Sequence, residues 1–167
     1  PYKGIDTFLK AALKFIKKFP DSDVKFIIAG KGDITEYSDL ISIIPEESIK
    51  IINEEISNEK YESIIYSSFA TVLPYNDATN TGNIPLANSL NTPCIVSNTG
   101  ALPEEVIANR TGLIFEKRDV EGLFNCFSEL FLNQKLLIKL EKNSYDYYQS
   151  NYKWGSIAEK LIKSLDK

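Results

Sequence analysis

One stretch, from Thr71 to Glu105, does most to limit what this chain can fold into. A short apolar run ends at Pro74, a polar turn rich in Asn and Thr follows, and a helix candidate at Ile84–Leu90 leads into a second apolar run. This order is a strand, a turn, a helix and a strand, and parallel strands require such a crossover. The stretch therefore predicts a parallel β-sheet covered by helices.

The rest of the chain repeats this alternation of apolar runs and amphipathic segments. Apolar runs predict strands at residues 24–29, 49–52, 71–74, 94–97 and 113–115. Helical spacing predicts helices at about 6–19, 36–44, 84–90 and 135–149, and two more that begin at the caps Asn58 and Asp119. A last helix would carry Trp154, Ile157, Ala158, Leu161, Ile162 and Leu165. We therefore expect one α/β domain over residues 1–167, with a doubly wound, Rossmann-like parallel sheet.

The loops that follow the predicted strands gather the candidate binding residues. In doubly wound sheets ligands bind outside the carboxyl ends of the strands. The loops at Gly30–Asp33, Asn53–Ser57, Tyr75–Asn83 and Ser97–Leu102 should meet at that edge. The first is only part of a dinucleotide fingerprint, because no third glycine stands in the required place, and its glycines could simply make a tight turn.

The turn before the central helix offers a position for an anion. The backbone N–H groups of Gly82, Asn83 and Ile84 come together where a helix start carries unpaired donors and partial positive charge. Gly82 lets a phosphate approach the main chain, and Pro85 suits a first helical turn. Every strand-to-helix junction shares part of this geometry, so a ligand and a purely structural turn remain equal alternatives here.

Charge and composition exclude several classes of function. The net charge is −4 with no basic block, so nucleic acid and acidic membranes are poor candidate partners. The absence of histidine removes His-based triads and most zinc sites. Cys94 and Cys126 have no metal-like spacing and predict buried thiols in a reducing compartment. Because the chain contains no methionine, we expect a fragment or a processed product.

Several short motifs stand in a recognisable order. They are Tyr2-Lys3-Gly4, Gly30-Lys31-Gly32-Asp33, Val72-Leu73-Pro74-Tyr75, Gly100-Ala101-Leu102-Pro103-Glu104, Thr111-Gly112-Leu113-Ile114 and Tyr152-Lys153-Trp154. Their order, over nearly the whole chain, resembles the C-terminal, donor-binding half of retaining glycosyltransferases of the GT-B fold, family 4 (glycosyl transferases group 1).

The resemblance implies a set of donor-binding residues. These are Lys3, Gly30, Gly32, Asp77, Thr81, Gly82, Asn83 and Ile84. Lys3 would neutralise the diphosphate of a nucleotide sugar, where departing charge needs a positioned cation; a lysine is otherwise usually only solvated. The residues Thr81 to Ile84 would hold the distal phosphate through backbone N–H groups. Asp77 would bond a sugar hydroxyl, or cap its own backbone as an Asp in a turn often does.

The chain also departs from the family. Ala78 and Leu86 stand where the family usually has two glutamates, so a ribose-binding carboxylate is absent at position 86. The stretch Asp77–Pro85 is similar instead to a variant seen in bacterial surface-polysaccharide transferases. The family's arginine before Lys3 lies outside the chain, and so does a strand preceding Pro1 that would be central in the sheet. We expect the sheet either to close over that gap or to be filled there by another chain. No pair of residues suggests a general base or nucleophile.

The function implied for the whole enzyme is hexosyl transfer from a nucleotide-diphosphate sugar to a glycan or lipid-linked acceptor, with retention, in bacterial surface polysaccharide synthesis. The resemblance implies no metal and no cofactor, and a cytoplasmic enzyme, with peripheral association at the inner face of the membrane as an option. The acceptor-binding N-terminal half would be absent, so this fragment alone should be inactive. Two alternatives stay open: a non-catalytic nucleotide-binding or regulatory module, and a phosphoacceptor signalling domain using Asp77, which lacks the acidic cluster that Mg²⁺ would need.

Overall fold

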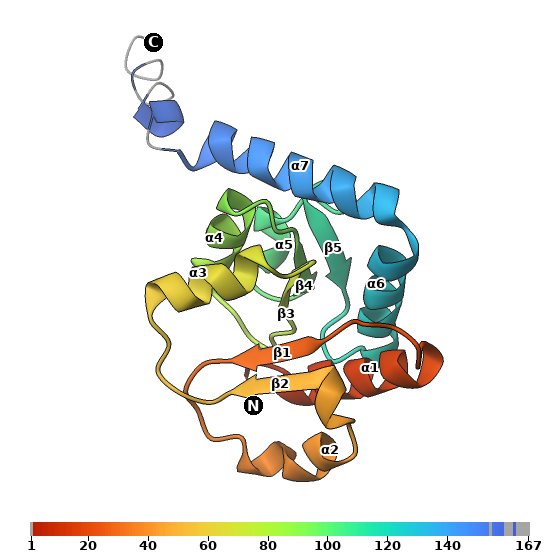
Figure 1. Cartoon of the computed structure of the whole chain (residues 1–167). Coiled ribbons are helices and arrows are strands. Elements are labelled where there is room, and N and C mark those ends of the chain that lie inside the picture. The colour runs from red at the N-terminus through yellow and green to blue at the C-terminus, as the bar shows by residue number, and fades with distance from the viewer. Residues whose placement is uncertain (1, 154, 159–161, 163–167) are drawn as a thin grey trace.

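The strands form parallel sheets, which confirms the predicted doubly wound α/β fold. The computed structural model describes residues 2–153, 155–158 and 162 (Figure 1). All pairs between named strands are parallel, and the strand order is β1-β2 in one sheet and β3-β4-β5 in a second. The strands are β1 (Phe26–Ala29), β2 (Ile49–Ile52), β3 (Thr71–Leu73), β4 (Cys94–Ser97) and β5 (Gly112–Phe115).

Helices connect successive strands, as crossovers between parallel strands require. They are α1 (Ile5–Lys18), α2 (Ser38–Ser42), α3 (Asn58–Tyr66), α4 (Asn83–Ser89), α5 (Leu102–Glu105), α6 (Val120–Leu132) and α7 (Gln134–Asn151), with short 3-10 turns at Thr35–Tyr37 and Glu46–Ser48. The cap of α6 is confirmed, because Asp119 Oδ1 accepts from the Gly122 N–H at 2.9 Å. The cap of α3 is Ser57 and not Asn58: the Ser57 hydroxyl oxygen accepts from the Lys60 N–H at 3.3 Å.

Two other predicted helices differ from the prediction or lie largely outside the described residues. The helix predicted at 36–44 is a 3-10 turn followed by the five-residue α2, because Pro45 ends the segment before a longer helix can form. Most of the last predicted helix, including Trp154, Leu161 and Leu165, lies outside the described residues.

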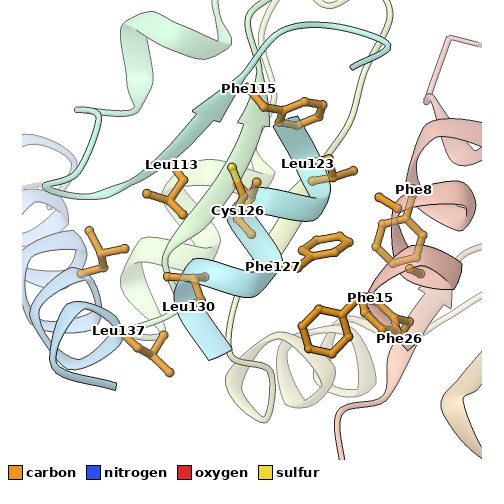
Figure 2. Close-up of a cluster of buried hydrophobic side chains, with 14 residues drawn as sticks. Phe8, Phe15, Phe26, Leu113, Phe115, Leu123, Cys126, Phe127, Leu130 and Leu137 are labelled. Carbon is orange, nitrogen blue, oxygen red and sulfur yellow. The ribbon is translucent and has the colours of Figure 1, made fainter. Parts of the chain in front are cut away.

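The side chains of β4 alternate between two hydrophobic layers, as a buried parallel strand requires. Ile95 points into a cluster with α1, α6 and α7, whereas Cys94 and Val96 point into a cluster with α3, α4 and α5. Figure 1 accordingly shows α3 and α4 across the β3–β5 sheet from α6. The first cluster is rich in phenylalanine (Figure 2), and the rings of Phe26 and Phe127 lie 5.2 Å apart between centroids.

The β1–β2 and β3–β5 sheets are not joined to each other. In the described chain, β1 pairs with β2 alone and β3 with β4 alone, and a cavity of about 1130 Å³ is lined by all residues of both β1 and β3. The expectation that the sheet closes over this gap is therefore wrong. The rings of Phe26 in β1 and Phe127 in α6 line this cavity and lie against each other, while α1 packs on α6.

Candidate functional site

The loops after β3 and β4 meet at the carboxyl edge of the sheet, as predicted, and the loop after β5 joins them there. The buried Ser97 hydroxyl donates to the Tyr75 carbonyl at 2.6 Å, which locks the backbone directly after β3. Gly100 has a φ of +52°, and a Cβ at that residue would lie 1.6 Å from the Ala78 carbonyl oxygen. The loop after β4 therefore packs directly on the turn after β3, and only glycine fits there.

The Lys3 backbone is fixed beside the end of β3. The Asn76 N–H donates to the Tyr2 carbonyl at 2.7 Å. Gly4 caps α1 with a φ of +64°, and a Cβ there would lie 1.8 Å from the Pro74 carbonyl oxygen. These contacts bring a residue from the start of the chain to a turn more than seventy positions away, since the Lys3–Tyr75 separation is 72 residues.

The Lys3 ammonium is held by two tyrosine side chains. Its Nζ donates to the Tyr75 hydroxyl oxygen at 3.1 Å and lies 4.8 Å from the Tyr75 ring centroid and 5.4 Å from that of Tyr2. Cation–π attraction therefore adds to the hydrogen bond. Burial alone would lower the pKa of Lys3, but the hydrogen bond and the charge interaction with Tyr75, followed by those with Tyr2, outweigh it and raise the pKa above its ordinary value. The side chain is a fixed cation at neutral pH.

Three of the expected donor-binding residues share one small cavity. Lys3, Asp77 and Thr81 line a space of about 370 Å³, whose other walls come from Tyr2, Tyr75 and the residues 78–80. Gly30, Gly32 and Asn83 instead line the larger cavity between β1 and β3. Tyr2, Lys3 and Tyr75 line both cavities, so these three residues mark where the two spaces meet.

The turn before α4 differs in detail from the expected row of free donors. The Asn83 N–H donates to the Thr81 hydroxyl oxygen at 3.2 Å, so this donor has an internal partner. Gly82 is exposed, has a φ of −68° and would contact no atom within 4 Å if it carried a Cβ. Ile84 is fully buried and anchors α4 in the core, so only its backbone could serve a ligand. The conformation of Gly82 does not itself require glycine.

The loops after β1 and β2 also pair with each other, as expected for adjacent parallel strands. The Gly32 N–H donates to the Asn53 side-chain oxygen at 3.0 Å, and the Gly30 N–H donates to the Ile52 carbonyl at 3.0 Å. Gly30 has a φ of +132°, which favours glycine for the turn itself. The two glycines therefore have a structural role whether or not a ligand touches them.

Sequence reasoning missed several residues of this edge. Tyr75 appeared only as the end of a motif, yet it holds Lys3 and also accepts from Asn83 Nδ2 at 3.3 Å. Tyr61, on α3, donates to Asn83 Oδ1 at 3.0 Å. Arg118, in the loop after β5, donates from Nε to the Asn76 side-chain oxygen at 3.3 Å. The one available signal was position, because Tyr75 and Arg118 each follow a predicted strand.

Ala78 and Leu86, which replace the family's glutamates, both pack against the buried cluster of α3, α4 and α5.

In the described residues no group of three or more Cys, Asp or Glu side chains could hold a metal ion. The described helices include none with the length and apolar character needed to cross a bilayer.

The fold and the residues at the carboxyl edge of the sheet together define a class of protein. This class is a doubly wound α/β domain with a fixed cation and a polar turn at the carboxyl ends of its strands, where such domains bind their ligands. Comparison with known proteins narrows the class. The family described as Glycosyl transferases group 1 matches residues 1–133. The chain belongs to this family.

Individual relatives agree with this membership. A GDP-mannose-dependent alpha-(1-6)-phosphatidylinositol monomannoside mannosyltransferase of Mycobacterium tuberculosis is 27% identical over 79 residues, covering 47% of this chain and 20% of that protein. The glycogen synthase of Mycoplasma mobile is 27% identical over 186 aligned positions, covering 99% of this chain and 36% of that protein. The chain thus spans about a fifth to a third of the length of these curated relatives.

Solved structures share the fold. The C-terminal domain of a glycosyl transferase group 1 family protein from Francisella tularensis matches with a TM-score of 0.82 and 20% identity, over 92% of this chain and 81% of that one. Anabaena HepE in complex with UDP matches with a TM-score of 0.76 and 12% identity, over 99% of this chain and 46% of that one.

Proposed function

We propose that residues 1–167 bind the nucleotide-diphosphate sugar of a retaining hexosyltransferase that glycosylates a glycan or lipid-linked acceptor. The proposed setting is bacterial surface polysaccharide synthesis, in the cytoplasm or at the inner face of its membrane. The donor-binding residues are Lys3, Gly30, Gly32, Asp77, Thr81, Gly82, Asn83 and Ile84, and the proposal includes neither a metal nor a cofactor.

One observation carries this proposal: the Lys3 ammonium stands at the carboxyl edge of the sheet, in the same small cavity as Asp77 and Thr81. A cation held there can neutralise the charge that gathers on a departing diphosphate. Asp77 is exposed and accepts hydrogen bonds, as a sugar hydroxyl requires. Family membership and the UDP-bound state of the HepE structure support a nucleotide as the ligand.

A ligand screen tests the proposal directly. UDP, GDP, ADP and their glucose, galactose or mannose derivatives are added to the purified chain, and the midpoint of thermal unfolding is measured. A ligand that binds only the folded chain stabilises it by about 2.7 kcal/mol at a concentration of 100 Kd. Lys3→Ala should abolish the rise in midpoint for the best nucleotide. If neither nucleotides nor nucleotide sugars at millimolar concentration raise the midpoint, the proposal is wrong.

The isolated chain should bind donor without transferring sugar, because transfer requires an acceptor positioned by the other half of the enzyme. Release of UDP or transfer of radiolabelled sugar by residues 1–167 alone would contradict this expectation.

A second candidate is a non-catalytic nucleotide-binding module. The observation in its favour is that Ala78 and Leu86, which replace the family's two glutamates, are partly buried apolar residues packed against the cluster of α3, α4 and α5. The longer protein that contains this chain separates the two candidates: donor turnover supports an enzyme, and donor binding without hydrolysis or transfer supports a binding module.

A further inference from the structure

A chain of hydrogen bonds crosses the site and joins four separate segments. Tyr61 on α3 donates to Asn83 Oδ1 at 3.0 Å, and Asn83 Nδ2 on α4 donates to the Tyr75 hydroxyl oxygen at 3.3 Å. Lys3 Nζ donates to the same hydroxyl oxygen at 3.1 Å. Burial raises the pKa of Tyr61, so its hydroxyl keeps the proton with which it starts this chain. Tyr75 is therefore the point on which the donors from Asn83 and Lys3 converge.

The bonds to Tyr75 leave its own proton unused. A phenol hydroxyl accepts hydrogen bonds at its oxygen and donates one through its proton. The Tyr75 oxygen accepts from Asn83 Nδ2 and from Lys3 Nζ, and in the described part of the chain the hydroxyl makes no bond as a donor. Tyr75 is only 7% exposed, and a buried donor without an acceptor is unfavourable. The position is thus prepared for an acceptor that the protein itself does not supply.

The charges around this hydroxyl select the kind of acceptor. Lys3 stands beside it as a cation with two further N–H donors, and Lys3 and Tyr75 line the same small cavity. An oxyanion can take donors from both groups, and charge-assisted bonds of this kind are the stronger ones. Asp77 lies on another wall of the cavity, where its carboxylate repels an anion and attracts a hydroxyl. An anion therefore fits at the Lys3 and Tyr75 end.

We infer that the Tyr75 hydroxyl donates to a phosphate oxygen of the nucleotide sugar, beside Lys3, and that the sugar hydroxyls face Asp77. This inference rests on the proposed function and adds a ligand-binding residue to it. The remaining links have a supporting role: the Ser97 bond to the Tyr75 carbonyl fixes the backbone at Tyr75, and Tyr61 and Asn83 orient the hydroxyl.

Tyr75→Phe removes the hydroxyl, both its proton and the oxygen that accepts from Lys3 and Asn83, and keeps the ring that packs against Lys3. Tyr37→Phe is the matched control, since Tyr37 is 6% exposed, is equally a buried tyrosine and lies outside the hydrogen-bond chain. Isothermal titration with UDP, inorganic pyrophosphate and uridine compares the variants with the wild type. We expect Tyr75→Phe to weaken UDP and pyrophosphate binding about tenfold, as loss of one charge-assisted bond implies, and to leave uridine binding unchanged. Tyr37→Phe should match the wild type for all three.

The outcomes separate this inference from the proposed function. If Tyr75→Phe binds UDP as tightly as wild type while Lys3→Ala loses UDP affinity, the hydroxyl has no role and the donor site stands. If Tyr75→Phe weakens uridine binding as much as UDP binding, the role of the hydroxyl is also overturned, because the effect would not concern the phosphate groups. Failure of wild type to bind UDP, GDP or pyrophosphate overturns both proposals.

A second measurement does not depend on the folding of a variant. In the wild-type chain with ¹³C-labelled tyrosine, addition of pyrophosphate should shift the Tyr75 ζ-carbon resonance by more than that of Tyr37. A Tyr75 resonance that stays in place at saturating pyrophosphate overturns the inference.

Discussion

Replacement of Gly82 by valine tests whether the turn before α4 binds the diphosphate. Gly82 has a φ of −68° and a ψ of −9°, a conformation open to every residue, and a Cβ there would meet no atom within 4 Å. The folded chain thus has room for the new side chain. We expect the free energy of unfolding to change by less than about 1 kcal/mol, because the substitution also restricts the unfolded chain.

The effect on the ligand should be much larger. A phosphate that approaches the Gly82 N–H would meet the valine side chain, and the charge-assisted bonds of this turn would be lost. Such bonds contribute about 2 kcal/mol, so the Kd for UDP should rise about 30-fold. Thr81→Ala should have a smaller effect, since the main-chain donors remain and the Asn83 N–H loses its internal acceptor.

The assay is isothermal titration of UDP, with circular dichroism and urea unfolding to establish that each variant is folded. Gly155→Val is the matched control, because a Cβ at Gly155 also meets no atom within 4 Å and the residue lies outside the site. If Gly82→Val is folded and binds UDP as tightly as wild type and Gly155→Val do, the diphosphate does not lie on this turn.

Three further predictions concern the fold. Burial raises the pKa of Cys94 to about 12 and that of Cys126 to about 11, so both thiols should react with a disulfide reagent at pH 8 only as fast as the chain unfolds; fast labelling of the native chain would contradict their burial. Because only the unfolded thiols ionise near pH 9, the free energy of unfolding should also fall as the pH rises above that value. Asp119→Ala removes the cap of α6 and should cost about 1 kcal/mol in urea unfolding, whereas Asp21→Ala, in an exposed turn, should cost almost nothing; equal stabilities would show that the cap is not used. Hydrogen exchange should be about tenfold faster at the Ala29 and Val72 amides than at the Ile95 amide, because the N–H groups of Ala29 and Val72 point toward the cavity, whereas β4 is paired on both sides. Equal protection of the three amides would mean that the gap between the sheets is closed.

The strand positions and the edge of the site follow from local sequence signals. The apolar run 94–97 and the run 49–52 are strands with the predicted bounds, because buried parallel strands need continuous apolar residues and little else. Asp119 caps α6 as its position before an apolar helix predicts. Parallel pairing then carries the loops after the strands to one edge, so the location of the candidate site could also be predicted. Lys3, Asp77 and Thr81 were proposed as donor-binding residues from the family resemblance, and the structure places all three around one cavity.

The contacts within the site were decided by the tertiary structure. Lys3 meets Tyr75 across 72 positions and Tyr61 meets Asn83 across 22, and no periodic pattern specifies a side-chain contact between such distant segments. These distances depend on how Gly4 and Gly100 let separate loops approach the backbone after β3. The division of the sheet is likewise non-local: β1 and β3 have ordinary strand sequences, and nothing in either run shows that their edges stay unpaired. Local sequence determines which segments become strands and helices, because backbone preference and burial act over a few residues; the arrangement that holds Lys3 exists only once those elements have packed.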